Sequence, residues 1–274
     1  MNFEKILIVG CTHGNEWTGE ALIQNYANEI QESFPDLPIE FSIANPKARE
    51  LNKRYIDEDL NRVFKNIDAN IESHERTLAK EFLKRIKDSK TLIIDIHSST
   101  SNLGNTLIIT QEDGFNFEVA KQVSQVSDAK VIYSPDIEKK YLVSQSTYGL
   151  MIEIGPVDHN TNQEKAISDC LLLTKEILKN VRQVDKDVHG KIKLYVERKD
   201  ILYPKTQGTK LNPIFDRSDF KKYHNSCQAF LNESTNEMIQ IDYEGEFFPI
   251  FIGEASYLEN GLAFTVCEEI EIEY

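Results

Sequence analysis

Residues 6–16 read ILIVGCTHGNE, and this stretch decides the fold. Its apolar, β-branched start closes at Gly10, which is typical of a buried strand that leaves a sheet. His13 and Glu16 follow three residues apart on a tight loop, so that each offers a ligand atom to one point. Zn²⁺ accepts imidazole nitrogen and carboxylate oxygen, and three protein ligands with one open position make a catalytic site. Because His-x-x-Glu also occurs by chance, the pair needs support from elsewhere in the chain.

Two more apolar runs supply that support. One run, TLIIDIH, ends in His97, and the other, LMIEIGP, contains Glu153. In an open α/β sheet, ligands bind beyond the carboxyl ends of the strands. We therefore predict a zinc site with His13, Glu16 and His97 as ligands, and with Glu153 close by as an acid–base group.

Some of these residues also have a structural interpretation. His97 could be a hydrogen-bonded histidine at a strand end, and Glu153 could be a buried carboxylate paired with a basic residue. Asp95 lies two residues before His97, so its side chain leaves the strand on the same face. It either orients a zinc-bound histidine or serves as a hydrogen-bond acceptor at the strand end.

Residues 54–62 read RYIDEDLNR and offer positive charge within an acidic chain. Guanidinium groups bind carboxylates in bidentate geometry and stabilise a developing oxyanion. Arg54 and Arg62 are therefore candidates for binding substrate, with Asp57 and Asp59 as struts that hold them. The alternative is a solvated surface, which alternating charges on a loop commonly form.

The composition argues against several classes of function. The chain has 274 residues, with 31 Lys and Arg against 45 Asp and Glu, which gives a formal net charge of −14. So acidic a chain argues against non-specific binding to nucleic acid or to an anionic membrane. No stretch approaches the roughly 20 continuous apolar residues of a membrane helix, and no signal peptide is recognisable. The four cysteines lie far apart without a C-x-x-C pair, so we expect reduced thiols and a cytoplasmic protein.

Strands and helices alternate over the first two thirds of the chain. We expect strands at 6–9, 39–43, 91–97, 106–109, 130–133 and 150–154, and helices at 17–30, from 73, at 115–126 and at 163–181. The polar segment 47–66 has no clean period, and we expect a structured loop there. This alternation predicts an α/β fold whose mostly parallel, mixed sheet is covered by helices on both faces.

Near Asp185 the pattern changes to period two. Residues 191–197, 246–251 and 266–274 alternate apolar and polar side chains, as antiparallel strands with one wet face do. We therefore predict two domains. A zinc-dependent catalytic α/β domain would span residues 1–186, and a smaller β-rich domain would span residues 187–274.

Taken together, the motifs resemble a known family. The chain contains, in order, GCTHGNE, NPKA, RYIDEDLNR, DIHSSTSNLG, IEIGP and GEASY. This set is similar to the aspartoacylase branch of the aspartoacylase/succinylglutamate desuccinylase family, which is related to the zinc carboxypeptidases. The similarity runs from residue 5 to about 157 and continues more weakly to Phe264. It implies a zinc-carboxypeptidase-like fold, one Zn²⁺ per chain and assembly as a homodimer.

The resemblance also implies catalytic roles. His13, Glu16 and His97 would hold zinc, and Glu153 would be the general base and acid. Arg54 would polarise the scissile carbonyl and stabilise the oxyanion that forms from it.

For substrate binding, the resemblance implies a second set of residues. Asn61 and Arg62 would bind a carboxylate of the amino-acid part, and Tyr257 and Tyr141 match family tyrosines on the substrate side. Gln145 occupies the position of a family arginine that clamps a second carboxylate. An amide donates a hydrogen bond but carries no charge, so the selection of a dicarboxylic amino acid is open at this point.

These roles predict an amidohydrolase that removes the acyl group from an N-acyl amino acid, with N-acetyl-L-aspartate as the expected substrate. N-succinylglutamate or another N-acyl amino acid is the alternative within the enzyme class. Peptide cleavage is disfavoured because the C-terminal domain would narrow the site. Outside the enzyme class, the alternative is a catalytically silent ligand-binding protein that kept the fold.

Overall fold

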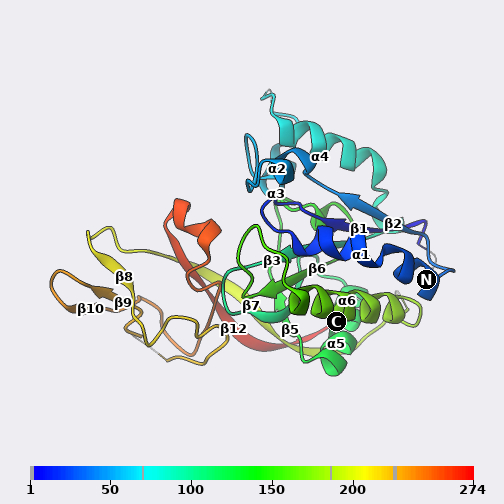
Figure 1. Ribbon diagram of the computed structural model, residues 1–274. Helices are drawn as coiled ribbons and strands as arrows, with labels where there is room; N and C mark the ends of the chain where they lie inside the picture. Colours follow the sequence, from blue (N-terminus) through cyan, green and yellow to red (C-terminus); the bar gives the residue numbers. More distant parts are fainter. Residues whose placement is uncertain (1–2, 70, 186, 225–226) are drawn as a thin grey trace.

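The computed structural model describes residues 3–69, 71–185, 187–224 and 227–274. Its main element is a nine-stranded sheet with the order β11-β12-β7-β5-β4-β6-β3-β1-β2 (Figure 1). The strands of this sheet are β1 (Lys5–Gly10), β2 (Ile39–Ile43), β3 (Thr91–Ser98), β4 (Gly104–Ile109), β5 (Lys130–Tyr133), β6 (Tyr148–Gly155), β7 (Lys191–Leu202), β11 (Phe248–Ile250) and β12 (Leu262–Glu273). The helices are α1 (Thr18–Ser33), α2 (Pro46–Glu50), α3 (Leu60–Val63), α4 (His74–Arg85), α5 (Gly114–Ser127) and α6 (Glu164–Val181), with short 3-10 turns η1 (Phe64–Asn66), η2 (Asp88–Lys90), η3 (Val143–Gln145) and η4 (Ala255–Asn260).

The centre of the sheet is parallel. β1 pairs in parallel with β2 and β3, and β3 pairs in parallel with β6. Every residue of β3 and of β6 is buried, which is expected of strands covered on both faces and explains their nearly unbroken apolar sequences. β4 runs antiparallel to β6 and parallel to β5, so the sheet is mixed.

Helices cover both faces of the sheet. On one face, Ile6 and Ile8 pack into a core that contains residues of α1, α5 and α6. On the other face, Leu7 and Val9 pack with residues of α3 and α4. This alternation arises because successive side chains of a strand point to opposite faces. The predicted α/β fold is confirmed. Among the described residues, no helix is long and apolar enough to cross a membrane.

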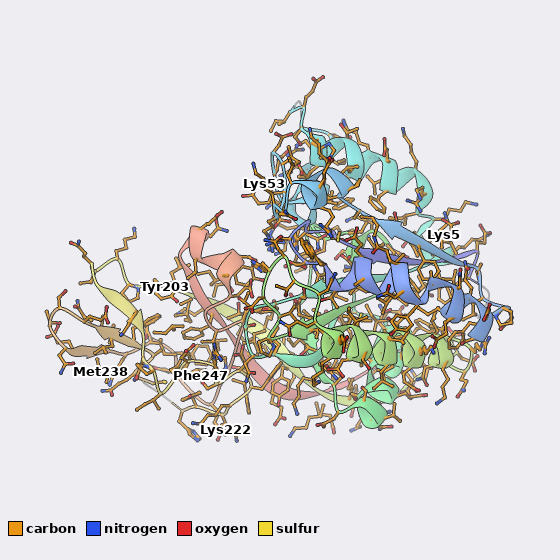
Figure 2. The ribbon with its side chains drawn as sticks, in the orientation of Figure 1. Lys5, Lys53, Tyr203, Lys222, Met238 and Phe247 are labelled. Carbon is orange, nitrogen blue, oxygen red and sulfur yellow. The ribbon has the colours of Figure 1, made fainter. Side chains whose placement is uncertain are left out.

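The C-terminal part of the chain extends the same sheet. β7 lies parallel to β5, β12 runs antiparallel to β7, and β11 closes the edge. Beyond them, β8 (Thr209–Leu211), β9 (Phe230–Asn232) and β10 (Glu237–Ile239) form a separate antiparallel sheet, which stands apart from the main layers in Figure 1. Phe247 and Tyr203, labelled in Figure 2, belong to a third apolar core that includes residues of both sheets. The predicted boundary at residue 186 lies outside the described residues, and the division into two domains stays a prediction.

The segment 47–66 is more regular than the loop expected from its sequence. It contains most of α2, all of α3 and the turn η1. Asn45 begins α2 by accepting a hydrogen bond from the Ala48 N–H, and Asp59 begins α3 by accepting one from the Asn61 N–H. Helices of four or five residues are too short to show a period, so these capping side chains were the available signal.

Candidate active site

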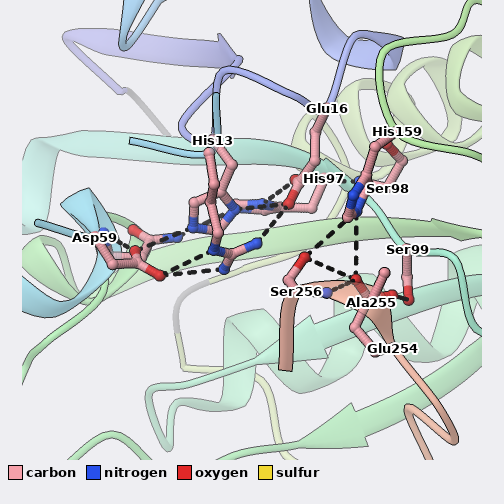
Figure 3. Close-up of polar contacts among 12 residues, drawn as sticks. His13, Glu16, Asp59, His97, Ser98, Ser99, His159, Glu254, Ala255 and Ser256 are labelled. Atoms are coloured by element: carbon pink, nitrogen blue, oxygen red, sulfur yellow. Dashed lines mark hydrogen bonds and ion pairs between the residues drawn. The ribbon is translucent and has the colours of Figure 1, made fainter. Parts of the chain in front are cut away.

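Three side chains with ligand atoms meet beyond the carboxyl ends of β1 and β3 (Figure 3). His13 and Glu16 lie on the loop between β1 and α1, and His97 lies near the end of β3. Nδ1 of His13 is 2.7 Å from one oxygen of Glu16, and Nδ1 of His97 is 2.8 Å from the other. All three side chains are buried, and one ligand atom from each lies within 4.8 Å of the others. This group could hold one metal ion.

A carboxylate holds the second ring nitrogen of each histidine. Nε2 of His13 lies 3.0 Å from Asp59 Oδ1, and Nε2 of His97 lies 2.9 Å from Asp95 Oδ2. Thr12 Oγ1 donates to the other oxygen of Asp95 at 2.6 Å. An Nε2–H that donates to a carboxylate leaves the lone pair of Nδ1 available to a metal ion. Asp59 provides this hydrogen bond for His13, whereas Asp95 lies at ion-pair distance from His97 and its Oδ2 accepts no hydrogen bond from the described residues.

The carboxylates around His13 and His97 favour a positive charge within the group of ligand-type side chains. Burial by itself lowers the pKa of His97, but the carboxylates of Asp95 and Glu16 raise that pKa well above its usual range. Burial by itself raises the pKa of Glu16, but His13 and His97 hold it well below its usual range. A site that stabilises a protonated imidazole also suits a divalent cation, because both place positive charge among the same carboxylates. Two imidazole nitrogens and one carboxylate oxygen are a donor set that fits the predicted Zn²⁺.

Glu153 faces the same space from the neighbouring strand. It is the register partner of His97 between β6 and β3, and it lines a cavity together with His13 and His97. Its side chain is buried, and this burial raises the pKa of the Glu153 carboxyl well above its usual range. Within the described ranges it forms no ion pair with a basic side chain, so the alternative of a paired structural glutamate is not what the structure shows. A carboxyl with a raised pKa beside ligand residues is suited to accept and return a proton.

Arg54 is bound tightly to the group of ligands. Its Nη1 donates to Glu16 at 3.1 Å, and its Nε and Nη2 both donate to Oδ2 of Asp59, at 3.2 and 3.1 Å. Asp59 is therefore the strut expected for Arg54, whereas Asp57 accepts a hydrogen bond from the backbone N–H of His74. The interpretation of this segment as a solvated surface is wrong for Arg54, whose side chain is only 18% exposed.

The next two predicted residues, Asn61 and Arg62, line the same cavity. Asn61 is buried, and its Oδ1 accepts a hydrogen bond from the Leu142 N–H at 2.9 Å. Arg62 donates to the Asn61 carbonyl, and its guanidinium carbon lies 5.1 Å from the ring centre of Tyr141. This stacking holds the Arg62 guanidinium against an aromatic wall of the cavity.

The cavity has a volume of about 440 Å³ with its opening to solvent included. The predicted residues that line it are His13, Arg54, Asn61, Arg62, His97, Tyr141, Glu153 and Tyr257. Glu16 lines a smaller adjoining cavity. Gln145 lines neither, because its Nε2 donates to the backbone carbonyls of Lys139 and Tyr141. The structure thus brings the predicted residues together except for Gln145.

Glu254, which was not predicted as a site residue from the sequence, connects the C-terminal part of the chain to the end of β3. One of its oxygens accepts hydrogen bonds from the backbone N–H and Oγ1 of Thr100, and the other accepts from the backbone N–H of Ser256. His159 forms an ion pair with the same carboxylate at 3.3 Å. Glu254 is 3% exposed, and this burial by itself raises the pKa of its carboxyl. The hydrogen bonds that it accepts, of which that from His159 has the largest effect, nevertheless lower the pKa to about 2. These contacts fix η4, which carries Tyr257, beside His13, Glu16 and His97, the metal-type group (Figure 3). The position of Glu254 within the GEASY motif was the signal that could have revealed it.

We expect Glu254→Ala to lower the free energy of unfolding by roughly 3 kcal/mol, because several buried donors lose their acceptor together. We also expect kcat/KM to fall at least tenfold, because Tyr257 loses its fixed position. Chemical denaturation and steady-state kinetics measure the two effects. Glu259→Ala, on the exposed side of the same turn, is the matched control. Equal effects of the two substitutions would contradict this role for Glu254.

Glu75 is a second residue that sequence reasoning missed. It is fully buried, and its carboxylate accepts hydrogen bonds from the backbone N–H groups of Ile56, Asp57 and Glu58. Because these donors belong to the segment that carries Arg54, Glu75 shapes that segment from α4. A glutamate in the first turn of a helix is common, so nothing local marked it.

The mixed sheet carries a His–Glu–His group and a buried glutamate at its carboxyl edge. This combination defines a site of the metallohydrolase type. Comparison with known proteins agrees with this class. Residues 2–181 match the family described as "Succinylglutamate desuccinylase/Aspartoacylase catalytic domain". The chain belongs to the aspartoacylase/succinylglutamate desuccinylase family of hydrolases, so the predicted family and enzyme class are confirmed.

Individual relatives extend over nearly the whole chain. The chain is 30% identical to a protein of Trichodesmium erythraeum and 31% identical to one of Nostoc, both named "probable aspartoacylase", with at least 96% of each chain covered. In fold it is similar to murine aminoacylase 3, with a TM-score of 0.90 at 21% identity, covering 100% of this chain and 97% of that one. It is also similar to succinylglutamate desuccinylase from Vibrio cholerae, with a TM-score of 0.67 at 16% identity, covering 99% and 85%.

Proposed function

We propose that this protein is a zinc-dependent amidohydrolase that removes the acyl group from an N-acyl amino acid. The observation that carries the proposal is the convergence of His13, Glu16 and His97 beside Glu153, in a cavity that also contains arginines. N-acetyl-L-aspartate is the first substrate to test, because the curated relatives are named for it and the motifs predict it. N-succinylglutamate is the alternative that the family name supports.

The proposed cofactor is one Zn²⁺ per chain, held by His13, Glu16 and His97. When bound, zinc supplies Lewis-acid chemistry at the scissile carbonyl. We propose that Arg54 donates hydrogen bonds to the oxygen on which negative charge develops, because its guanidinium lies next to the ligands. Glu153 takes a proton from the attacking water and gives it to the departing amine, which its raised pKa favours.

The amino-acid part of the substrate would be bound on the Arg62 side of the cavity. Arg62 is proposed to pair with the substrate α-carboxylate through a bidentate contact, with the backbone carbonyl of Asn61 accepting a hydrogen bond from the Arg62 guanidinium and holding it in place. Tyr141 and Tyr257 line the cavity on the same side and would exclude water and donate hydrogen bonds. The proposed binding role of Gln145 could only be indirect, through the carbonyl of Tyr141 to which it donates.

Removal of the metal should abolish hydrolysis. We expect a strong chelator to reduce turnover of N-acyl amino acids to background and to lower the melting temperature, because a ligand that binds only the folded state stabilises it. Stoichiometric Zn²⁺ should restore both quantities, whereas Mg²⁺ should not, since it prefers an all-oxygen site. Full activity in protein shown by elemental analysis to be free of metal would refute the proposed mechanism.

The cytoplasmic location and the homodimer stay predictions. Sedimentation velocity of the purified chain tests the second.

A further inference from the structure

The cavity extends across the sheet to a wall that is acidic. From the metal-type group it passes β6, β4 and β5 and reaches β7, where it ends at Glu197. Because neighbouring strands lie about 4.8 Å apart, the three steps from β6 to β7 amount to roughly 14 Å between backbones. Its floor along this path is formed by Met151 of β6, Ile108 of β4 and Ser134 after β5. This space is long enough for an extended amino-acid side chain.

The position of Arg62 shows which half of the substrate would lie there. Arg62 lines the part of the site that leads to Glu197. It does not line the small cavity on the other side of the ligands, where Ser98 and Ser99 lie. If Arg62 pairs with the α-carboxylate, the acyl group lies near Ser98 and Ser99, and the amino-acid side chain points toward Glu197.

A bulge in β7 places two carboxylates on this wall. Between β7 and β12 the register shifts, so that Val266 pairs with Lys199 but Cys267 pairs with Glu197. Such a bulge changes the direction in which side chains point. Both Glu197 and Asp200 consequently line a second, larger cleft (the outer cleft), which shares Arg62, Tyr141 and Glu197 with the cavity. Without the bulge, residues three apart on a strand would point to opposite faces.

Neither carboxylate has a cationic partner within the described part of the chain. Glu197 accepts a hydrogen bond from Ser134 Oγ, and Asp200 accepts one from Thr265 Oγ1 at 2.7 Å. The ion pairs formed among the described residues include neither of them; on the neighbouring β-strand positions Lys193 pairs with Glu269 and Arg198 with Glu268. Burial, and after it the charge of Asp200, raises the pKa of Glu197 to about 7, although the Ser134 hydrogen bond and the more distant charges of Lys140 and Arg62 act to lower it. Glu197 is half-buried and Asp200 is exposed. A charged carboxylate that is partly removed from water without a paired cation is unfavourable, and a cation supplied by the substrate would relieve this.

Among the described residues, the Lys and Arg side chains that line this cavity are those of Arg54 and Arg62, and neither is left over for a second substrate carboxylate. Arg54 is engaged with Glu16 and Asp59, and the guanidinium of Arg62 is assigned to the α-carboxylate. Lys140 shares the outer cleft with Glu197 and Asp200 but does not line the inner cavity, and its Nζ lies 4.9 Å from the ring centre of Tyr141. The side-chain carboxylate of an acylated aspartate or glutamate would therefore face Glu197.

We propose that Glu197, assisted by Asp200, makes this enzyme selective for N-acyl amino acids with a cationic side chain, of the lysine, ornithine or arginine class, and unfavourable for dicarboxylic ones. This inference rests on the proposed deacylase function and assigns its substrate class. The mechanism of amide hydrolysis stays the same; only the recognition of the side chain differs.

The test compares three Nα-acetyl amino acids on zinc-loaded protein. Nα-acetyl-L-lysine carries the cation, N-acetyl-L-norleucine has nearly the same shape without charge, and N-acetyl-L-aspartate carries the opposite charge. We expect kcat/KM for the lysine derivative to exceed that for norleucine at least tenfold, and that for aspartate by more. Glu197→Gln should reduce the lysine-to-norleucine ratio at least tenfold, mainly through KM, while Glu271→Gln, which removes an exposed carboxylate from β12, should not change it.

The possible outcomes separate this inference from the function on which it rests. A preference for acetylaspartate, or a lysine-to-norleucine ratio that Glu197→Gln does not change, overturns the inference and leaves the deacylase function standing. If no N-acyl amino acid is hydrolysed, the proposed function fails and the inference fails with it. Calorimetric binding of the free amino acids adds a readout without turnover, in which L-lysine should bind at least tenfold more tightly than L-norleucine. Equal affinities would also overturn the inference.

Discussion

Glu153→Gln should lower kcat by roughly a thousandfold or more while the zinc content stays unchanged. Gln has nearly the shape of Glu but cannot take up a proton from water or return one to the leaving amine, and each general acid–base step contributes about 10²–10⁴ in rate. Metal should be retained because Glu153 is not among the three ligand-type residues. Steady-state kinetics together with elemental analysis measures both quantities.

Two controls make this result specific. Glu237→Gln removes an exposed carboxylate from β10 and should leave kcat unchanged. Loss of zinc from Glu153→Gln would mean that Glu153 is a ligand rather than a base. A variant that keeps its metal and most of its activity would show that another group moves the proton.

His97→Ala should abolish both zinc binding and hydrolysis. Only His13 and Glu16 would remain from the ligand group, and two ligands do not make a stable zinc site. The substitution also leaves the carboxylate of Asp95, which is fully buried, without its imidazole partner. Removing one partner of a buried ion pair costs about 3–5 kcal/mol, so the melting temperature should fall as well.

The matched control for this variant is His224→Ala, because the side chain of His224 is 69% exposed and lies in the C-terminal part of the chain. It should retain zinc and full activity. Elemental analysis of the two purified variants, followed by thermal melts with and without added Zn²⁺, measures the difference. A His97→Ala protein that binds one zinc per chain with unchanged affinity would show that the metal lies elsewhere.

The parts of the site that could be predicted are those that the sequence places next to a buried strand. The apolar runs of β1, β3 and β6 fix the centre of the sheet, and the carboxyl ends of parallel strands lie at one edge. His13, Glu16, His97 and Glu153 follow or lie within these runs, so their meeting point could be inferred without knowledge of any contact. Asp95 could be included because it is two residues from His97 on the same strand.

The parts that could not be predicted depend on pairing between distant segments. The contact of Asp59 with His13 requires the path of the loop that Glu75 holds, and nothing local to Asp59 specifies that path. The alternation of apolar and polar residues in β7 shows which face of the strand is exposed to solvent. It does not show that β5 is the neighbouring strand. The bulge that directs Glu197 into the cavity results from its pairing with β12, which lies far along the sequence.

The addition of β7 and β12 to the main sheet has a practical consequence for anyone who wishes to make a minimal enzyme. A reading frame cut after α6 would still encode every metal-ligand residue, yet it would leave one side of β5 with bare backbone donors and acceptors. Such an edge recruits the strands of other molecules, so the shortened product should aggregate rather than fold alone. The two halves of this gene product are therefore better treated as one unit of expression.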